Sequence, residues 1–403
     1  MRRRDKRSLG WLIVAALLLS ACAPTLRVGT SGDYPPFSVI ENEDSVHGFD
    51  MSVARGYARD RNLNLELVLF SWPELEDQLR KGAFDVAMSG VTVRGDRLAI
   101  APMTSAVARA QAIVVVRSDH PDEPLDQPGV IIAVNRGGHL EKVTRARFSK
   151  AQIKTVLENR SLPDLLAARK VDAVVTDSAE HRSFHQVDSR VSEVLADDRK
   201  AYWVAPGRAD LARDMNEWMR KRLLDDWIQN ERGVWMDDRQ ISPLPIDDAI
   251  VVDHITQRLL LMPLVAEVKR SRDLAVEVPE REQQIYQAAR KVAAQVGLDP
   301  ERYAALVRVE VGTAKKIQRA VLAAEPTSTA ADLPDLEGQI RPAIDRIDAA
   351  IRTALVQAAP VQSSVETLAE ALRIDAPLPG FDEASRRAMA RAIRAIPAAH
   401  GSR

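Results

Sequence analysis

The chain has 403 residues, which at about 150 residues per domain predicts two or three domains. It carries 56 Lys and Arg against 57 Asp and Glu, a formal net charge of −1, and this balance argues against a nucleic-acid-binding protein. Hydrophobic residues at 46% and charged residues at 28% are typical of a globular protein and exclude wholesale disorder. The single cysteine, Cys22, excludes an intrachain disulfide and a thiolate metal cluster. We expect neither a metal nor a cofactor.

The first residues have the composition of an export signal. Five basic side chains among residues 2–7 precede an apolar run over residues 9–19, and Leu19-Ser20-Ala21-Cys22 follows. The run is too short to span a bilayer as a mature helix. Its ending resembles a bacterial lipobox, which implies that residues 1–21 are removed and that Cys22 is lipidated, leaving a membrane-anchored periplasmic lipoprotein. The alternative is ordinary signal peptidase cleavage near Ala21 or Ala23.

Composition divides the remaining chain into two folds. All six Trp lie at or before Trp235, and only five of the 18 Gly lie beyond it. Over residues 25–236, strand patterns alternate with helical patterns, which predicts a parallel sheet covered by helices. The predicted strands are residues 26–30, 65–69, 84–88, 130–134, 171–176 and 200–204, and the predicted helices begin near residues 48, 72 and 140.

The motifs of this part resemble those of the type 2 periplasmic amino-acid-binding proteins. They are Thr30-x-Gly32-Asp33-Tyr34-x-Pro36-Phe37, Gly48-Phe49-Asp50, Gly82-x-Phe84-Asp85 and Gly90-Val91-Thr92-x-x-x-x-Arg97. Within that superfamily, Ser71-Trp72, Asn135-x-Gly137-Gly138-x-x-Glu141 and Thr176-Asp177-x-x-Glu180 resemble the cyclohexadienyl dehydratases. The resemblance implies an α/β two-lobed fold over residues 25–236. It also implies conversion of prephenate to phenylpyruvate, or of arogenate to phenylalanine.

The dehydratase-like residues suit that chemistry. Prephenate loses its ring hydroxyl as water while carbon dioxide leaves, and hydroxide is a poor leaving group, so an acid must protonate it. We expect Glu180 to be that acid, because burial against Trp72 would raise its pKa above that of a free carboxyl. Arg97 and Thr92 would hold a substrate carboxylate. The resemblance adds Asn135 and Asp177 to the substrate-binding set.

These residues also have simpler explanations, and the pattern has departures. Asp177 and Glu180 could merely place negative charge in the first turn of a helix. His139 stands where the family usually has a small hydroxyl residue, Arg136 replaces a common Pro, and an expected lysine near Arg109 is missing.

Beyond the polar linker of residues 237–247, the sequence predicts an all-α domain over residues 248–403. Helical stripes cover residues 255–269, 280–296, 300–323, 340–357, 365–373 and 383–396, with a break at Pro263. Arg258 and Lys269 are eleven residues apart, three helical turns, so both should point the same way.

The order of polar residues in this domain resembles the all-helical AroQ class of chorismate mutases, and the Asp335-Leu336 to Ile340-Arg341-Pro342-x-Ile344-Asp345 block resembles its secreted subclass. By resemblance, Arg258, Arg281 and Arg341 would clamp the carboxylates of chorismate, while Lys269 and Gln318 would donate to its ether oxygen. Glu282 would bind the ring hydroxyl. Such preorganised cations and donors are what a pericyclic rearrangement needs. Ala314 and Val278 depart from the pattern, where a Ser or Thr and an Asp are common.

Together the two resemblances predict an exported bifunctional enzyme of phenylalanine biosynthesis that turns chorismate into prephenate and then phenylpyruvate. The main alternative is a chorismate mutase fused to a non-catalytic module that binds an amino acid or prephenate, with Asp177 holding an ammonium group. Two inactive domains would fit poorly with the presence of the whole mutase set.

Overall fold

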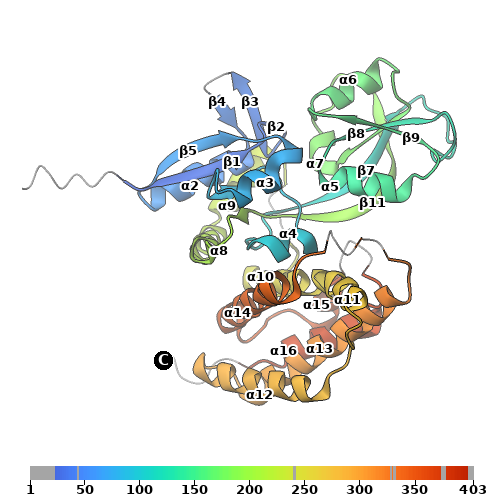
Figure 1. The fold of residues 1–403 in the computed structure, drawn as a ribbon. Coiled ribbons are helices and arrows are strands. Elements are labelled where there is room, and N and C mark those ends of the chain that lie inside the picture. The colour runs from blue at the N-terminus through green and yellow to red at the C-terminus, as the bar shows by residue number, and fades with distance from the viewer. Residues whose placement is uncertain are drawn as a thin grey trace, which may run out of the picture.

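The computed structural model describes residues 23–42, 45–238, 242–326, 329, 333–373 and 378–397. Figure 1 shows two α/β lobes side by side and a helical domain below them. The expected signal segment and Cys22 lie outside the described residues, as do Arg239, Gln240 and Ile241 of the predicted linker.

The first lobe is built on a mixed sheet with the strand order β12-β6-β1-β5. Its strands are β1 (Thr25–Thr30), β5 (Asn64–Leu69), β6 (Val86–Ala87) and β12 (Trp203–Val204), with a small second sheet of β2 (Asp33–Tyr34), β3 (Ser38–Asn42) and β4 (Ser45–His47). Its helices are α2 (Phe49–Asp60), η1 (Trp72–Glu74), α3 (Leu75–Arg80), α4 (Gly95–Ile100), α8 (Ala209–Leu224) and α9 (Trp227–Trp235). β12 runs antiparallel to β6, so the expected all-parallel sheet is wrong at this edge.

The second lobe has a five-stranded sheet with the order β11-β7-β10-β8-β9. Its strands are β7 (Ala108–Arg117), β8 (Ile131–Asn135), β9 (Gln152–Val156), β10 (Ala173–Asp177) and β11 (Ser189–Lys200), and its helices are α5 (His139–Arg147), α6 (Ser161–Ala167) and α7 (Ser178–His181). Every residue of β10 is buried, as expected for a central strand covered on both faces. β7 pairs antiparallel with β10 and with β11, which again corrects the all-parallel expectation.

Two chain segments connect the lobes, and we call residues 103–108 and 199–204 the hinge segments. They are bonded to each other, because Thr104 N donates to Tyr202 O at 3.0 Å and Val107 N donates to Lys200 O at 2.8 Å. The strand expected over residues 200–204 is therefore two elements: β11 ends at Lys200, and β12 begins at Trp203 in the first lobe.

The helical domain contains α10 (Ile246–Leu260), α11 (Met262–Ser271), α12 (Pro279–Gln295), α13 (Pro300–Leu322), the π-helical turn η3 (Leu336–Ile340), α14 (Arg341–Ala358), α15 (Val365–Ala371) and α16 (Glu383–Arg394). α10 begins inside the predicted linker, and the helix breaks at Leu261, beside Pro263. Among the described residues, Ile246–Ser271 is long and apolar enough to cross a membrane, with a mean hydropathy of 1.4, but 72% of that window is buried inside the protein. Helices α10 and α11, which make up this stretch, are therefore core helices of the helical domain.

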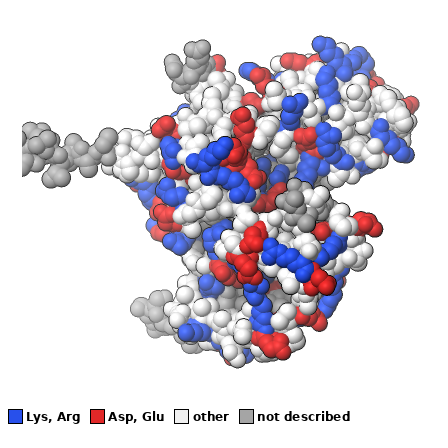
Figure 2. Space-filling view, viewed as in Figure 1, with Lys and Arg blue, Asp and Glu red and all other residues white. Residues whose placement is uncertain are grey.

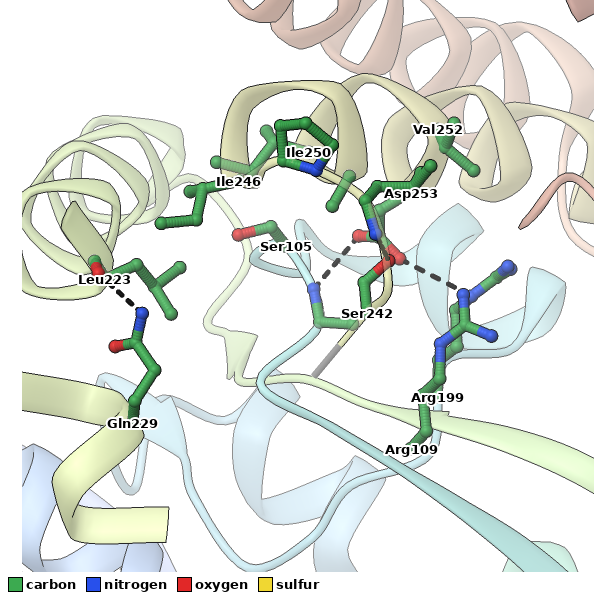
Figure 3. Close-up of a pocket in the computed structure, with 14 residues that line it drawn as sticks. Ser105, Arg109, Arg199, Leu223, Gln229, Ser242, Ile246, Ile250, Val252 and Asp253 are labelled. Atoms are coloured by element: carbon green, nitrogen blue, oxygen red, sulfur yellow. Dashed lines mark hydrogen bonds and ion pairs between the residues drawn. The ribbon is translucent and has the colours of Figure 1, made fainter. Parts of the chain in front are cut away.

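α10 packs on the hinge segments. Asp253 accepts from Ala106 N at 3.0 Å and lies 3.8 Å from Arg199 Nε, and these groups border a cavity of about 320 Å³ (Figure 3). Gln257 Nε2 donates to Thr104 O at 2.8 Å. The helical domain thus binds the segments through which the two lobes are joined.

Charges are mixed over the surface. Figure 2 shows Lys and Arg interspersed with Asp and Glu across this face, without a large area of either sign. This distribution gives no support to binding of a polyanion by bulk potential on this face.

Candidate active sites

The first candidate site lies between the two lobes, at the carboxyl ends of their strands. β10 ends at Asp177, which caps the short helix α7: its Oδ1 accepts from Ala179 N at 2.9 Å and from Glu180 N at 2.8 Å. The other oxygen, Oδ2, faces the cleft and accepts from the hydroxyl of Tyr34 in the opposite lobe. Asp177 therefore has both the simple capping role and an orientation into the cleft.

Glu180 is 1% exposed, on the turn that Asp177 caps. Burial raises the pKa of Glu180 well above its usual range, and the nearby charge of Asp177 raises it further. Thr176 Oγ1 donates to Glu180 Oε2. Both effects favour the protonated carboxyl, which is the form required of a general acid.

Trp72 contributes less directly than the sequence suggested. Its ring packs edge-on against Tyr34 and Phe70, with centroids 5.5 Å away in both cases. It lines the cleft, and its link to Asp177 runs through Tyr34.

The remaining sequence-predicted residues of this site come together in the cleft. Thr92, Arg97 and Asn135 all line it. Arg97 is 4% exposed, its Nη1 donates to Thr92 O at 2.8 Å, and its guanidinium lies 5.4 Å from the ring of Trp203. Burial and the neighbouring Arg94 lower the pKa of Arg97 to about 9. Asn135 is the last residue of β8, and its Nδ2 donates to Leu157 O at 3.3 Å.

The sequence analysis assigned no role to Lys200, which is buried and lines the cleft. Its ammonium lies 3.0 Å from Thr92 Oγ1 and 3.2 Å from Asp177 Oδ2. Arg109, near which a lysine was expected, is exposed beside the interdomain cavity. The one signal in the sequence that could have indicated Lys200 is a lysine at the start of the otherwise apolar residues 200–204.

His139, the departure noted in the Gly-Gly motif, also has a partner in the cleft. Its Nε2 lies 2.8 Å from Asp198 Oδ1, and Asp198 Oδ2 lies 3.5 Å from Lys200 Nζ. Burial alone would raise the pKa of Asp198, but His139 and Lys200 together hold it below its usual range. An ionised carboxylate therefore connects His139 to Lys200.

The cleft is closed. Asn159 N of the second lobe donates to Asp33 Oδ2 of the first at 3.1 Å, in addition to the bond between Tyr34 and Asp177. Gly137, with φ of +80°, lies so close to Pro73 that a Cβ would stand 2.8 Å from its Cα. Only about 20 Å³ of free space remains between the lobes, so a substrate can enter only when they separate.

The second candidate site lies among α11, α12, α13 and α14. Burial lowers the pKa of Lys269, and Arg281 and Arg341 lower it further, while Glu282 acts in the opposite direction. Lys269 Nζ donates to Val276 O at 3.2 Å, and Arg281 is exposed. The structure therefore brings together three cations that the sequence assigned to one site.

Glu282 and Arg341 each have an oppositely charged partner within the domain. Lys315 Nζ lies 2.9 Å from Glu282 Oε1, and Arg341 Nη1 donates to Glu337 Oε2. The sequence analysis did not assign a role to Lys315. Substrate would have to compete with these internal pairs.

Gln318 is 5% exposed on α13, and its Nε2 lies 3.9 Å from Met262 Sδ. Its Oε1 is buried without a hydrogen-bond partner among the described residues. A buried amide with an incomplete set of bonds is suited to meet a ligand.

Arg258 is the member of the mutase set least available to a substrate. It is 7% exposed on α10, its Nε donates to Asp348 Oδ1 at 2.7 Å, and it lies 3.8 Å from Glu310. Asp348 and Glu310 raise its pKa against the effect of burial. Its role as a carboxylate clamp stays a prediction, and it requires Arg258 to exchange Asp348 for substrate. Nothing in the described part of the chain groups three or more His, Cys, Asp or Glu side chains around a possible metal ion.

Comparison with known proteins agrees with this division. The bacterial extracellular solute-binding proteins, family 3, match residues 26–238. The chain belongs to this family. Chorismate mutase type II matches residues 246–319, so the chain joins a solute-binding domain to a chorismate mutase domain.

The solute-binding domain is similar to cyclohexadienyl dehydratase of Pseudomonas aeruginosa, with 30% identity over 233 residues, 53% of this chain and 83% of the relative. It is also similar to the arginine-binding extracellular protein ArtP of Bacillus subtilis, with 26% identity covering 46% of this chain and 79% of that protein. Among solved structures, the ancestral amino acid-binding protein AncCDT-1, a precursor of cyclohexadienyl dehydratase, matches with 26% identity and a TM-score of 0.50, covering 53% of this chain and 95% of that one. The predicted fold class and family are confirmed.

Proposed function

We propose that the chain catalyses two consecutive reactions, chorismate to prephenate in the helical domain and prephenate to phenylpyruvate between the two lobes. The observation that carries the second activity is Glu180, a buried carboxyl whose pKa burial raises, set beside a cleft that contains cations. A receptor that only binds an amino acid has no need of such an acid.

In the cleft, Glu180 would donate its proton to the ring hydroxyl of prephenate. The bond from the ring to its carboxyl group breaks, carbon dioxide leaves, and the released electron pair completes the aromatic ring as the hydroxyl departs as water. Arg97 and Lys200 provide positive charge for the two carboxylates of the substrate, and Thr92 supplies a hydroxyl beside them. Asp177 would orient Tyr34 and Lys200.

In the helical domain, Arg281 and Arg341 would bind the carboxylates of chorismate. Lys269 and Gln318 would donate to the ether oxygen as the carbon–oxygen bond breaks and the new carbon–carbon bond forms. Their surroundings support this: Lys269 lies within the electrostatic influence of both arginines, and the donor atom Nε2 of the buried Gln318 has only a weak contact, 3.9 Å from Met262 Sδ. Fixed donors of this kind stabilise developing charge without reorganisation.

The second candidate function is a chorismate mutase fused to a receptor, and the similarity to arginine-binding proteins favours considering it. One experiment separates the two. The purified chain is incubated with chorismate, and products are followed by chromatography. Phenylpyruvate supports the bifunctional enzyme, whereas accumulation of prephenate alone supports the receptor.

The family is one of extracellular proteins, which accords with the export signal expected from residues 1–21. We extend the proposal to lipidation at Cys22, supported by the lipobox-like sequence that ends there. The product of the first reaction would then be formed and consumed outside the cytoplasm.

A further inference from the structure

The surroundings of Lys200 have an unusual composition for a binding cleft that must receive a dianion. Its ammonium has two carboxylates within 3.5 Å, Asp177 at 3.2 Å and Asp198 at 3.5 Å. Two hydroxyls complete the shell, Thr92 Oγ1 at 3.0 Å and Tyr34 at 3.4 Å. The ammonium also lies 5.7 Å from the centroid of the Tyr34 ring.

These are the groups that recognise an ammonium ion: carboxylates, hydroxyl acceptors and an aromatic face. In this chain the ammonium they bind belongs to the protein. An amino acid entering the cleft would bring a second ammonium to carboxylates that are already in contact with Lys200.

Lys200 is also fixed in this place. It is 1% exposed. Its backbone forms an isolated antiparallel β-bridge with Thr92, and its carbonyl accepts from Val107 N at 2.8 Å. The preceding residue is Arg199, and its Nε lies 3.8 Å from Asp253 Oδ1 of the helical domain. The side chain starts from a bonded hinge segment, and its contacts with Thr92, Asp177 and Asp198 hold the ammonium in the cleft.

We propose that Lys200 determines specificity by occupying the place of a substrate ammonium, so that the cleft selects an α-keto acid, prephenate, over the corresponding α-amino acid, arogenate. This inference rests on the proposed dehydratase function. A keto oxygen or carboxylate accepts hydrogen bonds from Lys200, whereas an α-ammonium placed there meets a like charge and must share Asp177 and Asp198 with Lys200.

The test compares kcat/KM for prephenate and arogenate in the full chain and in two variants. The first is Lys200→Met, which keeps the length and removes the charge. The second is Lys200→Met combined with Asp198→Asn, which also removes the carboxylate left without its lysine partner and leaves Asp177 for a ligand. The matched control is Lys170→Met, an exposed lysine in the same lobe. Mutase activity and the melting temperature report whether each variant is folded.

We expect the wild-type chain to prefer prephenate by about a hundredfold or more, because like charges in contact disfavour a wrong ligand strongly. Both Lys200 variants should lower this preference at least tenfold, while Lys170→Met should not change it. A wild-type chain that uses arogenate as well as prephenate would overturn the proposal. So would a folded double variant in which both substrates lose activity by the same factor.

Equilibrium binding distinguishes failure of this inference from failure of the proposed function. If neither compound is turned over, calorimetry still measures the affinity of each for the wild-type chain and for the double variant. Because the helical domain can also hold prephenate, the affinity of the cleft is taken from the difference in affinity between the wild-type chain and the double variant. A change that favours arogenate supports the role of Lys200 even without dehydration, and no change in relative affinity refutes it.

Discussion

Replacing Glu180 by Gln removes one proton from the cleft and changes little else. Burial and the nearby charge of Asp177 raise the pKa of Glu180, which favours its uncharged form, and the amide of Gln is uncharged as well. The amide oxygen can still accept from Thr176 Oγ1, as Glu180 does. A positioned general acid contributes about 10²- to 10⁴-fold to a rate. We therefore expect kcat for prephenate to fall by this factor, equivalent to about 3–5 kcal/mol of transition-state stabilisation, with a much smaller change in KM.

Stability gives an independent check on the same variant. Because the folded-state pKa of Glu180 is raised, its contribution to stability is fully present below the unfolded-state pKa, about 4.3, and is lost as the pH rises through the folded-state pKa. Gln cannot ionise, so Glu180→Gln should melt no lower than wild type at alkaline pH, and the difference should increase with pH.

The assay starts from chorismate and measures prephenate and phenylpyruvate together. Glu180→Gln should accumulate prephenate at an unchanged mutase rate, while Glu123→Gln, at an exposed position of the second lobe, should behave as wild type. Phenylpyruvate formation within a few-fold of wild type in a folded Glu180→Gln chain would refute the assignment of the general acid.

Three further predictions follow from the same structure. Dehydration by the wild-type chain should slow as the pH rises through the raised pKa of Glu180. The mutase should lose activity only at alkaline pH, where Lys269, whose pKa is lowered by burial and Arg281, gives up its proton. Profiles of kcat against pH for both substrates on one preparation measure this, and a flat dehydratase profile contradicts it. Arg341→Ala should reduce mutase kcat/KM at least tenfold by loss of a charge-assisted carboxylate contact, with dehydration of added prephenate unchanged, and equal loss of both activities would point to misfolding. Cys22→Ser should release the protein from the membrane fraction, and equal membrane association of variant and wild type would count against lipidation.

The fold could be predicted wherever the pattern is local. Helix periodicity predicted α12 and α13 to within a residue or two, since Pro279, Asp299 and Pro300 mark their first turns. The antiparallel strands β7 and β11 were not predicted. Their pairing joins residues far apart in the sequence, such as Lys200 with Ala108, and nothing in either segment specifies the direction of the other.

The candidate sites divide in the same way. Asp177 and Glu180 lie three residues apart, so the turn after β10 places them together, and sequence reasoning could anticipate this. Arg258 was assigned by spacing along a helix, but its pairing with Asp348, 90 residues later, depends on how α10 packs against α14. The partners of Lys200 come from four separate segments, at Tyr34, Thr92, Asp177 and Asp198, so no spacing rule could have collected them.

The closed cleft sets a requirement on both domains. With about 20 Å³ between the lobes, the bonds of Tyr34 to Asp177 and of Asp33 to Asn159 must break before prephenate can enter. The lobes are joined by the two hinge segments, and α10 is bonded to both, through Asp253 and Gln257. Opening therefore has two routes: the hinge moves while it keeps its bonds to α10 and carries the helical domain with one lobe, or those bonds break. If the bonds are kept, the helical domain moves with one lobe and does not oppose opening. If they break, the helical domain opposes the opening of the cleft in every catalytic cycle. The two hydrogen bonds, 3.0 Å to Ala106 N and 2.8 Å to Thr104 O, are both made to residues 103–108, whereas the contact with the other hinge segment is the longer ion pair of Asp253 with Arg199, at 3.8 Å. Their common location favours the first route, because a helix bonded to one segment at two successive positions can follow it as a rigid unit.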